Sequence, residues 1–442
     1  MGGGLMQLVA YGAQDIYLTG QPQITFFKSV YRRHTNFATE SILQTINGSV
    51  AASSRVTVTI SRNGDLLKNL WICYNPSLLV LPAQTPAVTN MASDLGHAML
   101  GQLELEIGGQ LIDRQYGLWL TVWNQLTEQN PIGQQGELAV GGAEPMVNQP
   151  NGAQSSRYCR MAYTHQVPGA SVISTNGGPS EAYIPMKFWF CRNPGLAIPL
   201  IALQYHEVKF NITFAAGSTY VAGGVSNVAN CGLNVYADYV YLDTTERRQF
   251  AQNAHEYLID QLQYQSESSS GTSQTSTIRL NFNHPVKELI WCGTPNATLT
   301  AAQSVDFPLG PATPQTITNV NAATGATTPT SGLEAFNSPL VSKVILNGTD
   351  RFTQRNIKYF TRCQIWDCHT GFGSTGIADS IAVYSFALRP EEHHPSGTCN
   401  FSRIDTAQLY FSGDYINALT IFAINYNVLR IMSGMGGLAY SN

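Results

Sequence analysis

The chain has 442 residues, enough for two domains of about two hundred residues that each bury a core. Only 12% of the residues are charged, against about 25% in typical soluble domains, so much of the surface is expected to be covered by neighbouring proteins. The formal net charge is −4 and no block of Lys and Arg residues occurs, which argues against a protein that packages nucleic acid directly.

Targeting signals and disulfides are not expected. The first residues, Met1–Gln7, have neither the basic start nor the apolar centre of a secretory signal. No run of about 18 apolar residues occurs, so no transmembrane segment is predicted. The eight cysteines stand singly, unlike a disulfide framework. Cys73, Cys191 and Cys292 lie in apolar runs and are predicted to be reduced core thiols of a cytosolic protein.

Strands are predicted where apolar and polar residues alternate, because successive side chains of a strand point to opposite faces. The pattern occurs in Val56–Ser61, Leu103–Ile107, Val208–Thr213 and Ile278–Asn283. Each of these strands is expected to have one buried face and one solvent face. Short helices are predicted at Phe26–Arg33, Tyr116–Gln125 and Thr244–Asn253.

The strands follow one another without intervening helices, which favours antiparallel over parallel pairing. About eight antiparallel strands in two hundred residues, joined by long loops, are typical of a jelly roll. Two segments rich in Gly, Asn, Pro and Thr, Asn130–Ser180 and Thr294–Pro339, are predicted to be loops at the ends of the barrels.

Short stretches of the sequence recur in the same order, roughly two hundred residues apart. Lys68–Cys73 returns as Lys287–Cys292, and Leu233–Ala237 returns as Leu419–Ala423. The remaining matches are Arg32-Arg33 and Glu40–Leu43 with Arg247-Arg248 and Glu256–Ile259, Ile107–Gly109 with Leu346–Gly348, and Pro194–Phe210 with Pro395–Phe411.

The repeat predicts an all-β fold of two consecutive eight-stranded antiparallel jelly-roll barrels, with short helices and long loops. We expect an N-terminal arm of residues 1–26, a first jelly roll of residues 27–242 and a second of residues 243–442. The junction is placed near Asp243 because both copies end on the recurring strand. The small-residue stretch Ala215–Asn230 is an alternative boundary.

No catalytic, cofactor or metal site is predicted. A jelly-roll metalloenzyme of the cupin type needs two His residues one position apart, and no such pair occurs. His206-Glu207 and His255-Glu256 begin like a zinc-protease motif, but the second His is missing. Cys363, Cys368 and His369 lack a fourth zinc ligand, and Ile365-Trp366 between them is expected to lie on a strand. We therefore predict a protein without enzymatic activity.

Several long runs resemble the major capsid proteins of nucleocytoplasmic large DNA viruses, most closely the chlorovirus type of algal viruses. The resemblance covers essentially the whole chain and departs mainly in the predicted loops. The runs that carry it are Leu8–Asp15, Tyr17–Gly20, Pro22–Lys28, Tyr31–Arg33, Ile60–Asp65, Leu105–Gln110, Pro194–Val208, Pro395–Asp405 and Asn427–Tyr440.

The resemblance implies a double jelly roll that trimerises into a pseudo-hexagonal capsomer of an icosahedral capsid. It places the chain in the virion, near an inner membrane and after assembly in the host cytoplasm. Its expected partners are neighbouring capsomers and minor capsid proteins. Inner-face contacts are expected from the arm and the residues beside it, at Tyr11, Phe26, Phe27, Tyr31, Arg32 and Arg33. Covalent glycans are expected on outer loops, at Asn296, with Asn319 and Asn321 as further candidates.

Other functions remain open at this point. With the same fold, the chain could be a low-copy capsid paralogue or a scaffold that shapes a membrane and is then discarded. From another class, it could be a jelly-roll lectin in which Trp119 and Trp123 stack on sugars. Packing of both tryptophans in the core is the preferred interpretation.

Overall fold

The computed structural model describes residues 3–10, 12–79, 95–128, 157–162, 181–216, 228–268, 275–293, 316–320, 327–331, 340–371, 381–413, 416 and 418–440. By its internal contacts the chain divides into a short N-terminal unit, Met1–Phe37, and a body, Ala38–Asn442. In the described residues no helix is long and apolar enough to span a membrane.

The N-terminal unit contains two short helices, α1 (Gly3–Val9) and α2 (Ile16–Thr19). Asp15 closes the turn before α2, since its carboxylate accepts a 2.8 Å hydrogen bond from the Gly12 amide. The predicted helix at Phe26–Arg33 is wrong, because these residues form a turn and an extended segment. Their large apolar side chains are exposed, and so short a helix is not stable without an apolar face to bury.

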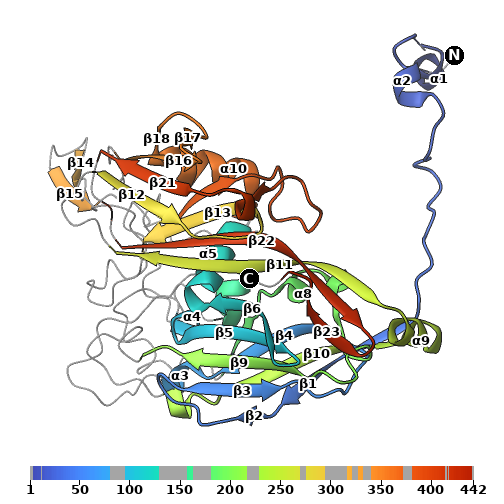
Figure 1. Ribbon diagram of the computed structural model, residues 1–442. Coiled ribbons are helices and arrows are strands. Elements are labelled where there is room, and N and C mark those ends of the chain that lie inside the picture. The colour runs from blue at the N-terminus through green and yellow to red at the C-terminus, as the bar shows by residue number, and fades with distance from the viewer. Residues whose placement is uncertain are drawn as a thin grey trace. The chain divides into compact units, whose positions relative to one another are not determined.

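The first half of the body contains ten strands in the described residues (Figure 1). They are β1 (Phe37–Gln44), β2 (Ile46–Asn47), β3 (Arg55–Thr59), β4 (Leu66–Tyr74), β5 (Leu100–Ile107), β6 (Gln110–Tyr116), β7 (Ala182–Pro185), β8 (Ile198–Pro199), β9 (Val208–Phe214) and β10 (Asn234–Leu242). The helical segments are α3 (Pro76–Leu79), α4 (Leu95–Ala98), α5 (Gly117–Thr127), α6 (Arg157–Ala162), α8 (Trp189–Arg192), η2 (Pro194–Leu196) and η4 (Val228–Asn230).

A helix, α9 (Thr244–Gln252), precedes the second half. Its strands are β11 (His255–Glu267), β12 (Thr275–Leu280), β13 (Pro285–Gly293), β14 (Thr316–Val320), β15 (Thr327–Ser331), β16 (Val341–Leu346), β17 (Thr349–Asp350), β18 (Arg355–Asn356), β19 (Ile381–Ser385), β20 (Cys399–Asn400), β21 (Ala407–Ser412), β22 (Leu419–Met432) and β23 (Met435–Leu438). The helical segments are the π-helix η5 (Tyr359–Cys363), α10 (Gln364–Cys368) and η6 (Phe401–Arg403). The predicted helices near residues 116–125 and 244–253 are thus confirmed as α5 and α9.

Each half folds into two facing antiparallel sheets with the same strand order. In the first half the sheets run β1-β10-β4-β7 and β3-β9-β5-β6, and in the second β11-β22-β13-β19 and β12-β21-β16-β17. Counting these eight strands along the chain, both halves give the orders 1-8-3-6 and 2-7-4-5. This Greek-key arrangement is the jelly roll. The predicted fold, two eight-stranded jelly-roll barrels, is confirmed.

Alternating residues fill the barrels as predicted. Val56, Val58, Leu103 and Leu105 point into the core of the first barrel and are fully buried. Ile278 and its alternating neighbours do the same in the second barrel. The two barrels also share a turn, because Gly108-Gly109 after β5 and Asn347-Gly348 after β16 all have positive φ. This backbone conformation favours Gly and Asn, which explains the recurrence of the turn in the sequence.

The prediction that the polar residues of β5 and β9 face solvent is partly wrong. Glu104 is buried, with both oxygens engaged by Arg55 and Arg114 at 2.8 Å. Asn211 is also buried and donates a 2.8 Å hydrogen bond to Glu106. Polar residues on an outer face can leave water when partners for each charge stand on adjacent strands.

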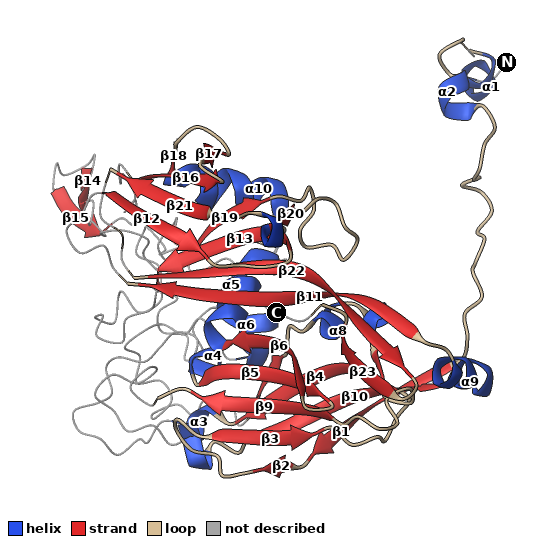
Figure 2. Ribbon diagram, viewed as in Figure 1, coloured by secondary structure: helices blue, strands red, loops and turns tan. Residues whose placement is uncertain are grey.

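The seam between the barrels is made by α5 and the sheet β11-β22-β13-β19 (Figures 1 and 2). Trp119 and Trp123 of α5 stack on each other, and the Trp119 ring centroid lies 5.1 Å from that of Phe422 on β22. The close packing of α5 needs glycine at its start, since a Cβ on Gly117 would lie 2.0 Å from the His97 carbonyl oxygen. The core interpretation of the two tryptophans is confirmed.

Replacing Trp119 with Ala should lower the free energy of unfolding by about 3–5 kcal/mol, because it empties a fully packed part of the seam. Trp366→Ala is the matched control, since Trp366 is 86% exposed and its loss should change stability by less than about 0.5 kcal/mol. Urea unfolding of both variants measures the difference. Equal effects of the two substitutions would contradict the assignment of Trp119 to the seam.

Candidate functional sites

The residues of the rejected zinc pattern differ in exposure. Cys363 is exposed, Cys368 is half-buried and His369 is buried, so the three do not present one ligand set. The strand expected at Ile365-Trp366 is wrong, because both residues lie in α10. Among the described residues no group of three His, Cys, Asp or Glu side chains could hold a metal ion.

The predicted assembly residues of the N-terminal unit are exposed wherever they are described. Phe26 is 88% exposed, Phe27 98% and Tyr31 81%, and Arg32 and Arg33 are exposed beside them. Tyr11 lies outside the described residues. Apolar side chains in such numbers on a short segment are typical of a surface that another protein covers. They belong to a larger exposed set in the same unit: Leu5, Met6, Leu8, Val9, Ile16, Tyr17, Leu18, Ile24 and Val30.

The predicted glycan sites lie mostly outside the described part of the chain. This holds for Asn296 and Asn321. Asn319 lies on β14, which pairs with β15 in a separate two-stranded sheet, opposite Thr328.

A second candidate site is a polar network at the edge of the seam. It begins with a bulge in β13, where the pairing with β22 shifts register between Val286 and Glu288. A bulge adds a residue to one strand and re-aims the adjacent side chains. Here the bulge directs both Lys287 and Glu288 toward the seam, where they form hydrogen bonds. Neither side chain is measurably exposed.

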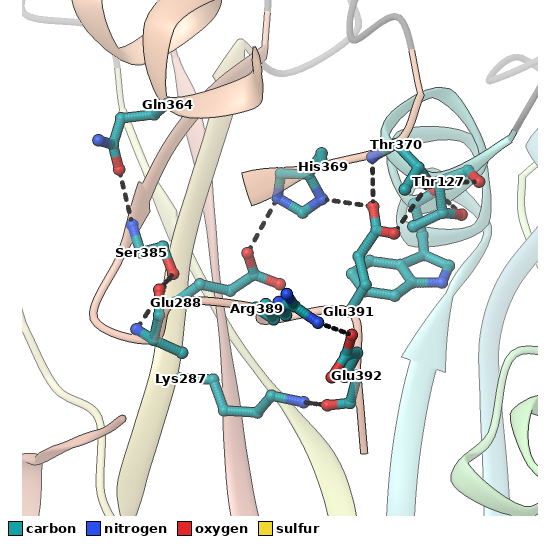
Figure 3. A network of polar contacts seen from close by, with 12 residues as sticks. Thr127, Lys287, Glu288, Gln364, His369, Thr370, Ser385, Arg389, Glu391 and Glu392 are labelled. Carbon is teal, nitrogen blue, oxygen red and sulfur yellow. Dashed lines mark hydrogen bonds and ion pairs between the residues drawn. The ribbon is translucent and has the colours of Figure 1, made fainter. Parts of the chain in front are cut away.

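His369, at the end of α10, joins two carboxylates (Figure 3). Its Nε2 lies 3.0 Å from Glu288 Oε2, and its Nδ1 lies 3.0 Å from Glu391 Oε1. Because both acceptors are carboxylates, both ring nitrogens donate and the imidazole carries a positive charge. Burial alone would lower the pKa of His369, but the two carboxylates outweigh it and raise the pKa to about 9.

A second group of charges centres on Asp260 of β11. Its carboxylate lies 3.4 Å from Lys287 Nζ and 3.4 Å from Arg192 Nη2 of α8. Lys287 also donates to the Glu392 carbonyl at 3.1 Å, as Figure 3 shows. Burial lowers the pKa of Lys287, and Asp260 opposes that shift. One carboxylate therefore bridges a cation of each barrel.

The network also closes the end of α5. The Gly371 amide donates to the Leu126 carbonyl at 2.7 Å, and the Thr370 hydroxyl lies 3.2 Å from the Thr127 carbonyl. The last carbonyls of a helix have no partner within the helix, so the Gly371 amide satisfies one that would otherwise be orphaned, while the single Thr370 hydroxyl proton has a closer acceptor in Glu391 at 2.8 Å. Thr370 is held in turn by Glu391, which accepts from its amide at 2.9 Å.

The sequence did not reveal this network. In the sequence, His369 stands out only as a rejected zinc ligand, and nothing singles out Glu391. The one available signal is Lys287-Glu288, two charged residues beside the apolar run Leu289–Cys292. Charges next to a buried strand indicate a bulge or a paired site, although not the identity of the partner.

Comparison with known proteins decides the family. Residues 25–243 match the family described as the major capsid protein N-terminus, and residues 246–437 match the large eukaryotic DNA virus major capsid protein family. The chain belongs to the major capsid proteins of large eukaryotic DNA viruses.

Individual capsid proteins are similar to this chain along its whole length. The major capsid protein of Pyramimonas orientalis virus is 45% identical, with all of both chains covered. That of Paramecium bursaria Chlorella virus 1 is 40% identical, again over all of both chains. A solved structure, the quasi-atomic model of the PBCV-1 virus capsid, matches with a TM-score of 0.71 and 35% identity, covering 95% of this chain and all of the other. The predicted resemblance, the virion location and the capsid function are confirmed.

The His369 network should make this capsid protein less stable at alkaline pH. The pKa of His369 is about 9 in the folded chain, against about 6.5 when unfolded. Its contribution is therefore fully present below pH 6.5 and is lost as the pH rises through 9. Its size is on the order of 3 kcal/mol.

The predicted loss of stability is tested by measuring the unfolding free energies of the unmodified chain and of His369→Gln from pH 6 to 10. The difference between the two should shrink steadily toward high pH. His255→Gln is the control, since within the described residues His255 pairs with no carboxylate and its Nε2 lies 2.8 Å from the Phe250 carbonyl oxygen. A pH-independent difference for His369→Gln would show that the imidazole is uncharged in the fold.

Proposed function

We propose that three copies of this capsid protein associate into a capsomer with a pseudo-hexagonal outline, which tiles an icosahedral capsid. The observation that carries the proposal is the strand order, which is identical in the two barrels. Three chains with two like barrels each present six similar units around a threefold axis. Such a particle can occupy a sixfold lattice position.

The N-terminal unit is the proposed assembly segment on the inner face of the capsid. Tyr11, Phe26, Phe27, Tyr31, Arg32 and Arg33 are the proposed contacts with minor capsid proteins. Support comes from the exposed aromatic side chains, which would gain roughly 25 cal/mol for each Å² of apolar surface that a partner covers. The two arginines could pair with acidic groups at the edge of that contact.

The proposed organisation of the chain is an arm of residues 1–26, a first jelly roll of residues 27–242 and a second of residues 243–442. β10 ends at Leu242 and α9 begins at Thr244, which supports the boundary. We further propose assembly in the host cytoplasm, beside an inner viral membrane, without direct nucleic-acid contact and without enzymatic activity. Covalent glycans at Asn296, Asn319 or Asn321 complete the proposal.

The alternatives are less well supported. A lectin that stacks sugars on Trp119 and Trp123 is disfavoured because each of these side chains is only 3% exposed. A low-copy paralogue or a discarded scaffold would share the fold. They differ from a major capsid protein in abundance, because only a major capsid protein dominates the protein of mature virions.

Light scattering of the purified native protein should give about three times the chain mass of 48.1 kDa, unchanged by dilution. An obligate trimer is expected to bury more than about 2,000 Å² at its contacts, which makes it resistant to dissociation. A stable monomer would contradict the capsomer. The denatured mass of the same sample should exceed 48.1 kDa if glycans are attached, and an unmodified mass would reject them.

Deleting residues 2–20 should leave the trimer intact and reduce the yield of full-size capsids when the other capsid components are present. The body retains both barrel cores without this segment, so its melting temperature should not change. Electron microscopy counts the capsids. Full-size shells in normal yield would remove the assembly role of residues 2–20, Tyr11 included.

A further inference from the structure

A cavity of about 410 Å³ opens at the seam, within the size range of small-molecule sites. Its walls come from both barrels. Lys187, Arg192 and Trp71 belong to the first barrel, Trp123 to α5 and Glu391 to the loop after β19. Much of the remaining lining is apolar, including Leu70, Pro185 and Met186. The cavity therefore combines an apolar wall with two cations.

The carboxylate in this lining is already engaged. Glu391 bonds to His369 at 3.0 Å and to the amide and hydroxyl of Thr370 at 2.9 and 2.8 Å. The hydrogen bond from His369 opposes the effect of burial and lowers the pKa of Glu391. The negative charge of Glu391 is already paired with His369, so it does not neutralise the cations across the cavity.

The two cations are incompletely paired among the described residues. Lys187 lies 5.0 Å over the ring of Tyr158, and no carboxylate of the described part forms an ion pair with it. Arg192 lies 5.1 Å over the ring of Trp123 and reaches Asp260 at 3.4 Å. It shares that carboxylate with Lys287, and its Nε is buried without a hydrogen-bond partner in the described residues.

This arrangement costs free energy in the empty cavity. Burial lowers the pKa of Lys187 to about 8, Glu128 opposes the shift, and the positive charge of Arg192 adds to it. Burying an ammonium is unfavourable, Glu128 offsets only part of that cost, and a second cation nearby increases it. An anion placed between Lys187 and Arg192 would remove both penalties.

We propose that the cavity binds a carboxylate carried on a small apolar or aromatic body. The carboxylate lies between Lys187 and Arg192, whose planar guanidinium suits carboxylate oxygens. The body packs on Trp71 and its apolar neighbours. A single negative charge fits best, because Glu391 lines the same wall and Asp260 already offsets part of the charge of Arg192. The carboxylate belongs either to a free organic acid or to an acidic side chain of another copy of the chain.

Benzoate is the probe, and benzamide is its uncharged counterpart of the same shape. Calorimetric titration of the full-length protein should show saturable benzoate binding that is at least about tenfold tighter than benzamide binding. Lys187→Met should weaken benzoate by about tenfold or more, whereas Lys187→Arg keeps the charge and should retain most of the affinity. Lys343→Met is the control, since Lys343 is paired with Asp350 on the second barrel.

Repeating the titration on free capsomers and on assembled capsids separates the two sources. Binding to both forms indicates a free organic acid. Binding to the free capsomer alone, with Lys187→Met weakening self-association into capsids, indicates an acidic side chain of another copy. Equal affinity for benzoate and benzamide, or benzoate binding that Lys187→Met leaves intact, would overturn the proposal. So would the absence of benzoate binding together with unchanged self-association of Lys187→Met, once a melting curve has shown that the variant is folded.

Discussion

The structure of the body depends on one sheet that is buried on both faces. In β13 and β22, alternate residues such as Trp291 and Ile421 face the core of the second barrel. The residues between them, such as Ile290 and Phe422, face α5 across the seam. A jelly-roll sheet normally leaves its outer face to water, so its strands alternate. Here Leu419–Asn427 are all buried, and the apolar area of that outer face is what holds the two barrels together.

Apolar packing is not directional, so the seam also needs contacts that fix its geometry. The charged network supplies them at the edge of the apolar patch, where the β13 bulge delivers Lys287 and Glu288. Buried charges are costly, and replacing them with apolar residues often stabilises a protein. Their retention is understandable if Asp260, which joins Arg192 of one barrel to Lys287 of the other, sets the register between the barrels. The incomplete pairing left at Arg192 follows from that shared carboxylate and adds to the positive charge of the adjacent cavity.

The fold could be predicted from sequence because the repeated stretches fall on equivalent strands. Lys68–Cys73 lies on β4 and Lys287–Cys292 on β13, the third strand of each barrel. Local alternation also located the core residues correctly. The charged network could not be predicted, because His369, Glu288 and Glu391 are far apart in the sequence and meet only through tertiary packing. The prediction of a helix at Phe26–Arg33 failed for the opposite reason. The local sequence pattern is helical, but nothing within the N-terminal unit packs against these residues.

The two barrels have the same topology but different surfaces. Topologically equivalent positions show where these surfaces differ. On the outer face of the first barrel, Trp71 pairs with Tyr236 across β4 and β10. The same topological positions of the second barrel hold Ile290 and Phe422. The first pair is half-exposed, and Trp71 donates a 2.8 Å hydrogen bond to Asp238, whereas the second is buried under α5. At these positions the outer face of the second barrel is buried in the seam, whereas that of the first barrel is half-exposed. In the proposed trimer, the six barrels would therefore be alike in fold but alternate in surface, which limits its true symmetry to threefold.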